Sequence, residues 1–291
     1  MELCIDFGGT EIKLAVIDEG RLLDSDSLGV QGSVDDLSAA AAAARVLIAR
    51  SDSPPTAVGI AVPGVVSPAS GRMLHANDKY EFLQGFDLPS WAKDEFGLPG
   101  VVENDARAAL IGETSTGSAT GERDAVLVTL GTGIGTAAMI DGVALRGLTG
   151  HAGILGGHVT VDIDGRICPC GNVGCAEALA SSWALGNRGI ELTVKDLFAS
   201  DEHAELQSSF LRVWGAAVVT LVQMYDPSVV ILSGGILRAG ETVSAPIETY
   251  VREHLWPSMT PPRFVVPPEP EYSVARGLSS LARIQEDQEN K

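Results

Sequence analysis

The sequence predicts an α/β protein made of two copies of one domain, and three observations support this fold class. A strand, a glycine-rich turn and a second strand occur twice, with Gly8 and Gly131 at equivalent positions 123 residues apart. Helical segments follow each copy of the pattern. The composition, with 33 glycines, 45% hydrophobic and 5% aromatic residues, is typical of α/β proteins with many tight turns. A repeat of this length indicates a duplicated domain.

The first copy begins with an apolar strand at residues 2–7 (ELCIDF). The turn at 8–10 (GGT) leads into a second strand at 12–17, and the turn at 18–20 (DEG) leads into a third at 21–24. Glycine supplies the backbone freedom that such tight connections need. This segment therefore predicts a sheet that starts with two hairpins.

The second copy repeats these elements in the same order. A strand at 125–130 (AVLVTL) precedes the turn at 131–136 (GTGIGT), and a strand at 137–140 (AAMI) follows it. The turn at 141–142 (DG) leads into the last strand at 143–147. We expect a second sheet that starts in the same way.

The remaining elements alternate between helices and strands, as expected for an α/β sheet. Ser33 and Asp35 are start signals for the first helix, and Asp226-Pro227 ends the longest one. The predicted helices cover residues 34–50, 106–117, 202–226, 240–254 and 274–286, and the predicted strands cover residues 56–62, 101–103, 228–232 and 263–266.

Two domains that meet around a cleft are expected from this organisation. The smaller domain comprises residues 1–107 and is joined by the C-terminal helix at 274–286. The larger domain comprises residues 108–273 and contains a cysteine-rich segment at 158–177. No low-complexity linker separates the two domains.

The charge of the chain argues against two classes of partner. With 20 basic and 38 acidic residues, the formal net charge is −18, so nucleic acid and anionic membranes are unfavourable partners. Glu2 and Asp6 stand where a signal peptide would be basic or apolar. No apolar run approaches the length of a membrane span. Clustered cysteines without an oxidising context fit a reducing compartment, so we expect a cytoplasmic protein.

Four residues have the types and spacing of a structural zinc site. His158 is followed, after nine residues, by C168-P-C170-G-N-V-G-C175. Thiolate and imidazole are the ligands that tetrahedral zinc prefers, and four of them leave no open position. The alternatives are a cluster of free thiols or a disulfide, and a Cys168–Cys170 disulfide would close a strained ring. We expect zinc.

The two glycine-rich turns are candidate phosphate-binding loops. Their backbone N–H groups can surround phosphate oxygens without interference from side chains. Asp6, directly before the first turn, could hold hydrated Mg²⁺, and Thr10 or Thr132 could donate to phosphate. Lys13 could also reach a phosphate. As alternatives, Asp6 is a turn former at a strand end and Lys13 is a solvated strand lysine.

Two further segments lie where strands end. Glu103-Asn104-Asp105 passes into a helix, where Asn and Asp commonly form caps. A carboxylate at that place could instead act as a general base on a hydroxyl group. Ser233-Gly234-Gly235 follows an apolar strand, where ligands bind in open α/β sheets, although a plain strand–helix turn fits equally well.

Taken together, these motifs resemble the ROK family of repressors, open reading frames and sugar kinases, and most closely its glucokinase-like kinases. The similarity extends over nearly the whole chain. The motifs that carry it occur in the family's order and are D6-F-G-G-T10-x-x-K13, E103-N-D105-A, L130-G-T-G-I-G135, H158-x9-C168-x-C170-x4-C175-x-E177 and S233-G-G-I236.

The resemblance implies an actin-like, hexokinase-like ATPase fold, usually dimeric, that uses ATP, Mg²⁺ and structural Zn²⁺ to phosphorylate a sugar. Asp105 matches the base that takes the proton from the sugar 6-hydroxyl. The residues that match sugar contacts are Asn104, Glu177, His158, Gly64 and Asn77. Those that match the nucleotide site are Asp6, Gly8, Gly9, Thr10, Lys13, Gly131, Thr132, Gly133, Gly234 and Gly235; Asp6 lies near Mg²⁺, and Gly234 and Gly235 lie on the adenosine side.

Two positions depart from the family pattern. The usual stretch is A-G-E-x-G-H, and counting back from His158 places Leu155 where Glu is expected. The missing carboxylate would accept from the C1–C2 edge of the sugar, so we expect a sugar that differs there from glucose. Arg107 replaces the usual Asn, and the sequence suggests no role for it. His151, taken as a surface residue, could alternatively supply a polar group.

Three functions fit the residues. The first is an ATP-dependent kinase acting on a primary hydroxyl. The second is a sugar-sensing regulator, but the family's repressors carry a DNA-binding segment before the first strand, which here begins at Glu2. The third is a kinase that uses polyphosphate or acts on a polyol.

Overall fold

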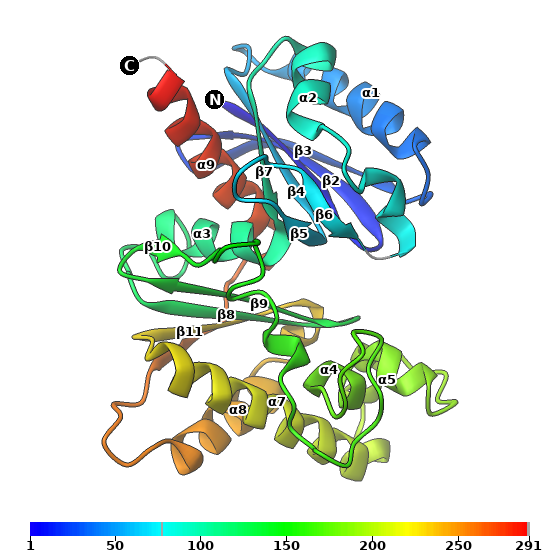
Figure 1. The fold of residues 1–291 in the computed structure, drawn as a ribbon, viewed down its shortest axis with the longest axis vertical. Coiled ribbons are helices and arrows are strands. Elements are labelled where there is room, and N and C mark those ends of the chain that lie inside the picture. The colour runs from blue at the N-terminus through cyan, green and yellow to red at the C-terminus, as the bar shows by residue number, and fades with distance from the viewer. Residues whose placement is uncertain (77, 290–291) are drawn as a thin grey trace. The chain divides into compact units, whose positions relative to one another are not determined.

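The computed structural model describes residues 1–76 and 78–289, so the expected sugar contact Asn77 lies outside the described residues. The chain forms two compact units, each built on a five-stranded sheet (Figure 1). The first unit comprises Met1–Thr120, Arg146–His151 and Glu271–Lys291, and the second comprises Gly121–Leu145 and Ala152–Pro270.

The sheet of the first unit combines an antiparallel start with a parallel continuation. The first three strands pair antiparallel, a fourth strand of the sheet pairs with the first in parallel, and a fifth pairs with that fourth strand in parallel. In spatial order the strands are β3 (Arg21–Gly29), β2 (Glu11–Asp18), β1 (Glu2–Phe7), β4 (Ala57–Val62) and β7 (Gly100–Asn104).

Helices cover both faces of this sheet. Figure 1 shows α1 and α2 on one side and α3 and α9 on the other. Alternate residues of β1 face the two layers: Leu3 and Ile5 are buried among α1 and α2, and Cys4 is buried against α3 and α9. The helices are α1 (Asp35–Arg50), α2 (Leu88–Phe96), α3 (Asp105–Ser115) and α9 (Ser273–Glu289).

Helices α3 and α9 pack unusually closely because glycines lie at their contact. A Cβ atom at Gly112 would lie 2.0 Å from the carbonyl oxygen of Ser273, and one at Gly277 would lie 1.8 Å from that of Ala108. The buried Glu113 accepts hydrogen bonds from the hydroxyls of Ser273 and Ser118 at 2.6 and 2.7 Å. The C-terminal helix is therefore an integral part of the first unit.

The second unit repeats the sheet of the first, which confirms the predicted duplication. Again three strands pair antiparallel and two more join in parallel. In spatial order the strands are β10 (Val143–Ala144), β9 (Ile134–Ile140), β8 (Ala125–Leu130), β11 (Val229–Ser233) and β12 (Arg263–Val265).

One large core holds the second unit together. Trp214, on the longest helix, stacks on Phe198 with ring centroids 5.6 Å apart and donates to the carbonyl of Ala180 at 2.8 Å. The helices of the unit are α4 (Ala176–Leu179), α5 (Ser182–Gly186), α6 (Val194–Leu197), α7 (Ala204–Tyr225) and α8 (Glu241–His254). The 3-10 turns are η2 (Gly156–His158), η3 (Asp201–His203) and η4 (Gly235–Ala239).

Several elements differ from those predicted. The third strand extends to Gly29 instead of ending at 24, and the strand predicted at 143–147 is paired only at 143–144. The sequence reading missed α2 and a small hairpin. The additional elements of the first unit are β5 (Gly64–Val66), β6 (Met73–Ala76), η1 (Asp78–Leu83) and η5 (Pro270–Tyr272).

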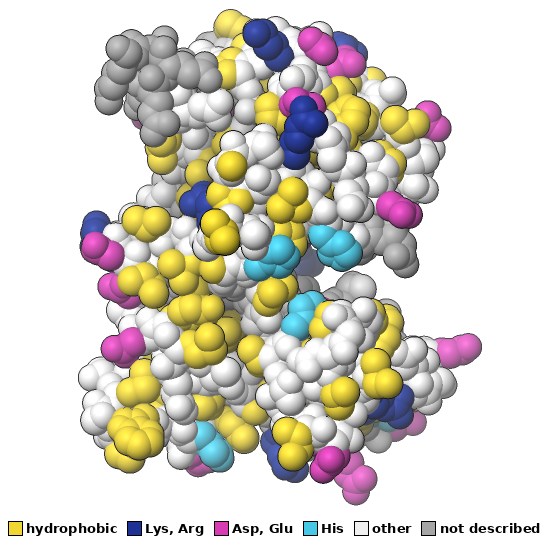
Figure 2. Space-filling model, viewed as in Figure 1, with side chains coloured by type: hydrophobic (Ala, Val, Ile, Leu, Met, Phe, Trp, Pro, Cys, Tyr) yellow, Lys and Arg dark blue, Asp and Glu magenta, His cyan; other side chains and the backbone are white. Residues whose placement is uncertain are grey.

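The boundary expected at residue 107 falls inside α3, which packs on α9. The first unit therefore continues to Thr120, and the segment Arg146–His151 also returns to it. Among the described residues, no helix has both the length and the apolar character needed to cross a membrane. On the face in Figure 2, the Lys and Arg side chains of the described residues lie singly and form no basic patch.

Candidate functional site

Asp105 lies at the junction of β7 and α3. The two interpretations of this segment, a helix cap and a general base, apply there to adjacent residues. Asn104 is the helix cap, because its Oδ1 accepts from the N–H of Arg107 at 3.0 Å. Asp105 Oδ1 accepts from the N–H of Ala106 at 2.8 Å and from Nδ2 of Asn104 at 2.9 Å. Burial raises the pKa of the Asp105 carboxyl. The cap thus leaves Asp105 available as a proton acceptor.

Asn104 also connects this junction to a second expected sugar contact. Its Nδ2 donates to the carbonyl of Gly64, the first residue of β5, at 3.1 Å. A Cβ at Gly64 would lie 2.3 Å from the carbonyl oxygen of His75, so the position requires glycine. The structure therefore brings Gly64, Asn104 and Asp105 together.

A buried ion network explains Arg107, for which the sequence suggested no role. Glu103 Oε1 accepts from Arg107 at 2.6 Å, and Oε2 accepts from Arg146 at 2.6 Å. Arg107 also donates to the carbonyl of Gly150 at 2.9 Å. Arg107 and Glu103 are 1% and 3% exposed, so both charges depend on these partners. The network fixes the segment 146–151 beside Asn104 and Asp105.

Asp6 is the second-to-last residue of β1 and has a buried carboxylate. Its Oδ1 is buried and has no hydrogen-bond partner among the described residues. Burial raises its pKa to about 7, the Asp105 carboxylate adds to this shift, and the Lys13 ammonium opposes it. An orphaned carboxylate oxygen is the type of ligand that Mg²⁺ prefers, so Asp6 fits the expected magnesium role.

Two side chains hold the first glycine turn by donating hydrogen bonds to its backbone carbonyl groups. Tyr80 Oη donates to the carbonyl of Gly8 at 2.7 Å, and Lys79 Nζ donates to that of Gly9 at 2.7 Å. The N–H of Gly8 is shared between the carbonyls of Asp6 and Glu11, at 3.0 and 3.1 Å. Thr10 lies exposed at the end of this turn. Sequence analysis missed Lys79 and Tyr80 because η1 lies some 70 positions away.

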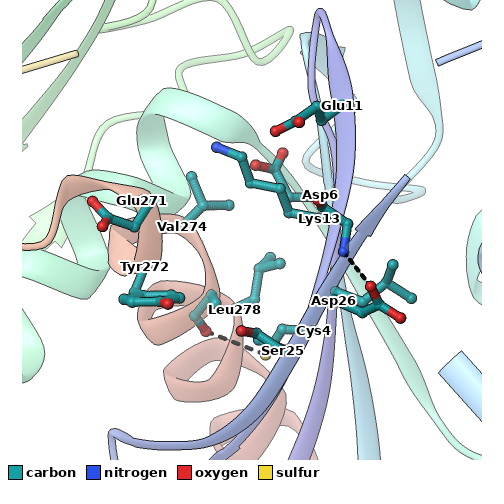
Figure 3. Close-up of a pocket in the computed structure, with 14 residues that line it drawn as sticks. Cys4, Asp6, Glu11, Lys13, Ser25, Asp26, Glu271, Tyr272, Val274 and Leu278 are labelled. Carbon is teal, nitrogen blue, oxygen red and sulfur yellow. Dashed lines mark hydrogen bonds between the residues drawn. The ribbon is translucent and has the colours of Figure 1, made fainter. Parts of the chain in front are cut away.

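A cavity of about 380 Å³ lies beside this turn in the first unit (Figure 3). Asp6, Glu11 and Lys13 line it from the β1–β2 hairpin, and Figure 3 shows Tyr272 and Leu278 facing them from the α9 side. Its lining combines apolar side chains with four carboxylates and one ammonium group. Lys13 and Asp6 therefore line the same cavity.

The second glycine turn is held differently. The N–H of Gly131 donates to the carbonyl of Gly133 at 3.1 Å and closes the turn, which leaves Thr132 exposed. Glu177 Oε2 accepts from the N–H of Ile134 at 2.8 Å. Glu177 thus contacts the turn, a role that the sequence reading did not assign to it.

The predicted zinc ligands converge in the second unit. The ligand atoms of His158, Cys168, Cys170 and Cys175 all lie within 4.8 Å of one another. His158 Nδ1 is 3.6 Å from Cys168 Sγ, and Cys170 Sγ is 3.6 Å from Cys175 Sγ. All four cysteines of the chain are free. A one-imidazole, three-thiolate set with tight turns between the ligands fits structural zinc.

Gly234 is required by the backbone. Its φ of +102° is unfavourable for other residues, and a Cβ there would lie 2.1 Å from the carbonyl oxygen of Leu130. The β8 and β11 strand ends are therefore in close contact, and Gly235 opens η4 directly afterwards. This geometry accounts for Gly234 without a ligand, so its nucleotide role stays a prediction.

No carboxylate stands between Ala152-Gly153 and His158. This segment has seven residues, whereas A-G-E-x-G-H has six. Counting back from His158 gives Leu155, and counting forward from Ala152-Gly153 gives Ile154; both are apolar. Leu155 is 44% exposed. His151 lies exposed in the first unit, and its Nδ1 is 2.9 Å from the Thr149 hydroxyl.

Comparisons with known proteins identify the family to which the chain is similar. A sequence profile of the ROK family matches residues 2–284. A glucokinase of Halalkalibacterium halodurans is 29% identical, with 87% of this chain and 86% of that protein covered. A xylose repressor of Bacillus spizizenii is 27% identical over 69% of this chain and 54% of the repressor.

Solved structures give the same result. A ROK hexokinase from Thermus thermophilus superposes with a TM-score of 0.83, at 28% identity, and covers 98% of this chain and 99% of its own. A ROK family glucokinase from Streptomyces griseus, solved with glucose and AMPPNP, has a TM-score of 0.82 and 30% identity, with 97% and 99% covered. These neighbours confirm the actin-like, hexokinase-like ATPase fold class.

Proposed function

Because this chain belongs to the ROK family, we propose that it is an ATP-dependent kinase that phosphorylates the primary hydroxyl of a sugar. The observation that carries the proposal is Asp105. Its pKa is raised by burial, and the donors from Asn104 and Ala106 both bind Oδ1, so neither occupies Oδ2. A fixed carboxylate with a raised pKa is suited to accept a proton.

In this proposal, Asp105 accepts the proton of the sugar hydroxyl as the hydroxyl oxygen attacks the γ-phosphorus. Asn104 and Gly64 orient the sugar beside Asp105, and the turns at 8–10 and 131–133 bind the phosphates. Most of the rate enhancement then comes from positioning and electrostatic stabilisation. Asp6 would hold Mg²⁺, which neutralises phosphate charge when bound. His158 and the three cysteines would hold zinc as a structural brace.

We further propose that the preferred sugar differs from glucose at C1 or C2. Neither Ile154 nor Leu155 can accept a hydrogen bond from a hydroxyl group at that edge. Leaving one sugar hydroxyl unpaired costs about 1–3 kcal/mol, which changes specificity tenfold or more. A sugar lacking that hydroxyl loses nothing at this position.

The test is a coupled ADP-release assay over glucose, N-acetylhexosamines, 1-deoxy and 2-deoxy sugars and polyols. We expect turnover with at least one 1- or 2-modified sugar at higher kcat/KM than with glucose. A strong preference for glucose or N-acetylglucosamine would refute the specificity proposal alone. Absence of phosphorylated product with every acceptor, using either ATP or polyphosphate, would refute the kinase.

The second candidate is a non-catalytic sugar-binding regulator, and the similarity to a xylose repressor favours it. Calorimetry separates the two functions: a regulator binds sugar without turning it over. A kinase that acts on a polyol is distinguished by the same assay. A kinase that uses polyphosphate releases no ADP, so it is distinguished by direct detection of the phosphorylated product with polyphosphate as donor. We also expect the protein to be cytoplasmic and to form a homodimer. Light scattering of the purified protein tests the oligomeric state.

A further inference from the structure

Glu177 occupies a position between two functional elements of the second unit. It lies in α4, two residues after Cys175, so its backbone is positioned by residues 158–177, which carry the expected zinc ligands and are called the metal segment below. Its Oε2 reaches Ile134, 43 positions earlier, and accepts the backbone N–H at 2.8 Å. Ile134 is the first residue of β9, directly after the glycine turn. The exit of that turn is therefore fastened by a side chain from the metal segment.

Gly133 shows how closely this carboxylate approaches the turn. A Cβ added at Gly133 would lie 2.5 Å from Glu177 Oε2 and 3.3 Å from its Cδ. The carboxylate thus fills the space that a side chain at position 133 would occupy. Because this obstruction is the end of a flexible side chain, alanine can be accommodated if Glu177 moves away from Ile134.

The other carboxylate oxygen faces the metal cluster. Glu177 Oε1 is 3.9 Å from His158 Nε2, and His158 Nδ1 is 3.6 Å from Cys168 Sγ. A histidine that binds a metal through Nδ1 directs its Nε2–H outward, and a carboxylate is a common partner for that group. Glu177 therefore accepts the Ile134 N–H with Oε2, while Oε1 lies 3.9 Å from His158 Nε2, beside the expected zinc ligands.

We propose that Glu177 is a positioning residue for the phosphate donor, in addition to any contact with the sugar. It keeps the turn Gly131–Gly133 in its binding conformation by anchoring the Ile134 amide. This inference rests on the proposed kinase function. It has a distinctive consequence, because a residue that contacts only the sugar would not affect nucleotide binding in the absence of sugar.

The experiment measures binding of MgADP by calorimetry without sugar. We expect Glu177→Ala to weaken MgADP binding about tenfold, because a charge-assisted hydrogen bond to the turn is lost. Glu177→Gln should stay within about threefold of the wild type, because its amide oxygen can still accept from Ile134. Glu205→Ala, an exposed carboxylate on α7, is the matched control and should change nothing.

A double-mutant cycle tests the shared geometry. Gly133→Ala should weaken MgADP binding about as much as Glu177→Ala, because the new methyl group displaces the carboxylate. The double variant should then be no weaker than the weaker single variant. Zinc content, measured as metal per chain, should stay unchanged in all variants, which shows that the cluster is intact.

The outcomes separate this inference from the proposed function. If the wild type binds MgADP and Glu177→Ala binds it equally well, the inference is wrong while the kinase proposal stands. Additive effects of Gly133→Ala and Glu177→Ala would also overturn it. If the wild type binds neither MgADP nor polyphosphate, both proposals fail.

Discussion

The two glycine turns have the same place in two equivalent sheets, yet the chain fastens them in opposite ways. Around 8–10, Tyr80 and Lys79 donate to backbone carbonyls. At 131–133, Glu177 accepts from the backbone amide that follows. In the first turn, backbone carbonyl groups accept from side chains. In the second, a backbone N–H donates to a side-chain carboxylate.

This difference shows that a duplicated backbone does not imply duplicated chemistry. In the first turn, side-chain donors neutralise the negative ends of the backbone carbonyl dipoles, which favours binding of an anion there. In the second turn, the hydrogen bond from the Ile134 N–H to the Glu177 carboxylate connects the turn to the metal segment. The residues that make these contacts come from η1 in the first unit and from α4 in the second. If the chemistry belongs to the first unit and structural support to the second, substitutions in the first unit should have the larger effect on turnover.

The largest effect is expected from Asp105→Asn. If the first unit carries the chemistry, kcat should fall about 10²–10⁴-fold because the general base is lost. Sugar affinity, measured by calorimetry, should change less than about threefold, because Asn104 and Gly64 remain. Asp94→Asn, an exposed carboxylate on α2, should keep full activity. Near-normal turnover of Asp105→Asn would remove the catalytic assignment.

Arg107→Leu tests how strongly the first unit depends on its buried ion network. We expect a loss of about 3 kcal/mol in unfolding free energy, because Glu103 and the Gly150 carbonyl each lose a buried partner. Urea unfolding measures it. Arg252→Leu, which breaks the exposed pair with Glu248, should change stability by less than about 0.5 kcal/mol. Equal effects of the two substitutions would contradict the network.

Asp6→Asn should change the dependence of stability on pH. The pKa of Asp6 is about 7 in the folded protein and 3.8 ordinarily, so folded protein holds a proton that unfolded protein releases between these values. Wild-type stability therefore falls as pH rises through this window. The variant avoids this loss and should be more stable above pH ~7 by on the order of 1–3 kcal/mol.

The measurement is urea unfolding of metal- and nucleotide-free protein between pH ~4 and ~8. The advantage of Asp6→Asn should vanish at the acidic end of that range. An advantage that is constant with pH would show that the carboxyl does not titrate in this window.

The smallest effect is expected from Tyr80→Phe, which releases the Gly8 carbonyl. Tyr80 is fully buried, so the lost hydrogen bond should lower unfolding free energy by about 1 kcal/mol. Tyr250→Phe, a half-buried residue on α8, serves as the control. If both substitutions give the same change, the first turn is not held through Tyr80.

Local patterns predicted most of the secondary structure. The predicted helix at 240–254 is observed at Glu241–His254, and the strand at 2–7 is observed at Glu2–Phe7. Gly8 and Gly131 indicated the duplication because each opens a glycine-rich turn directly after an apolar strand. The convergence of His158 with the three cysteines followed from ligand spacing alone.

Contacts between distant segments were beyond the reach of sequence. Arg107 pairs with Glu103 nearby, but its other partner, Gly150, is 43 positions away and returns to the first unit only in three dimensions. Lys79 and Tyr80 belong to a segment with no regular periodicity. The interdomain boundary was misplaced inside α3 because the packing of Gly112 on Ser273 depends on the C-terminal helix.

That C-terminal helix has a consequence for biosynthesis. The first unit needs α9 to cover one face of its sheet, yet α9 leaves the ribosome after every other element of the two units. The second unit lies almost entirely within residues 121–270 and is complete before that. We therefore expect the second unit to fold first during translation, while the first unit is completed only when α9 has been synthesised.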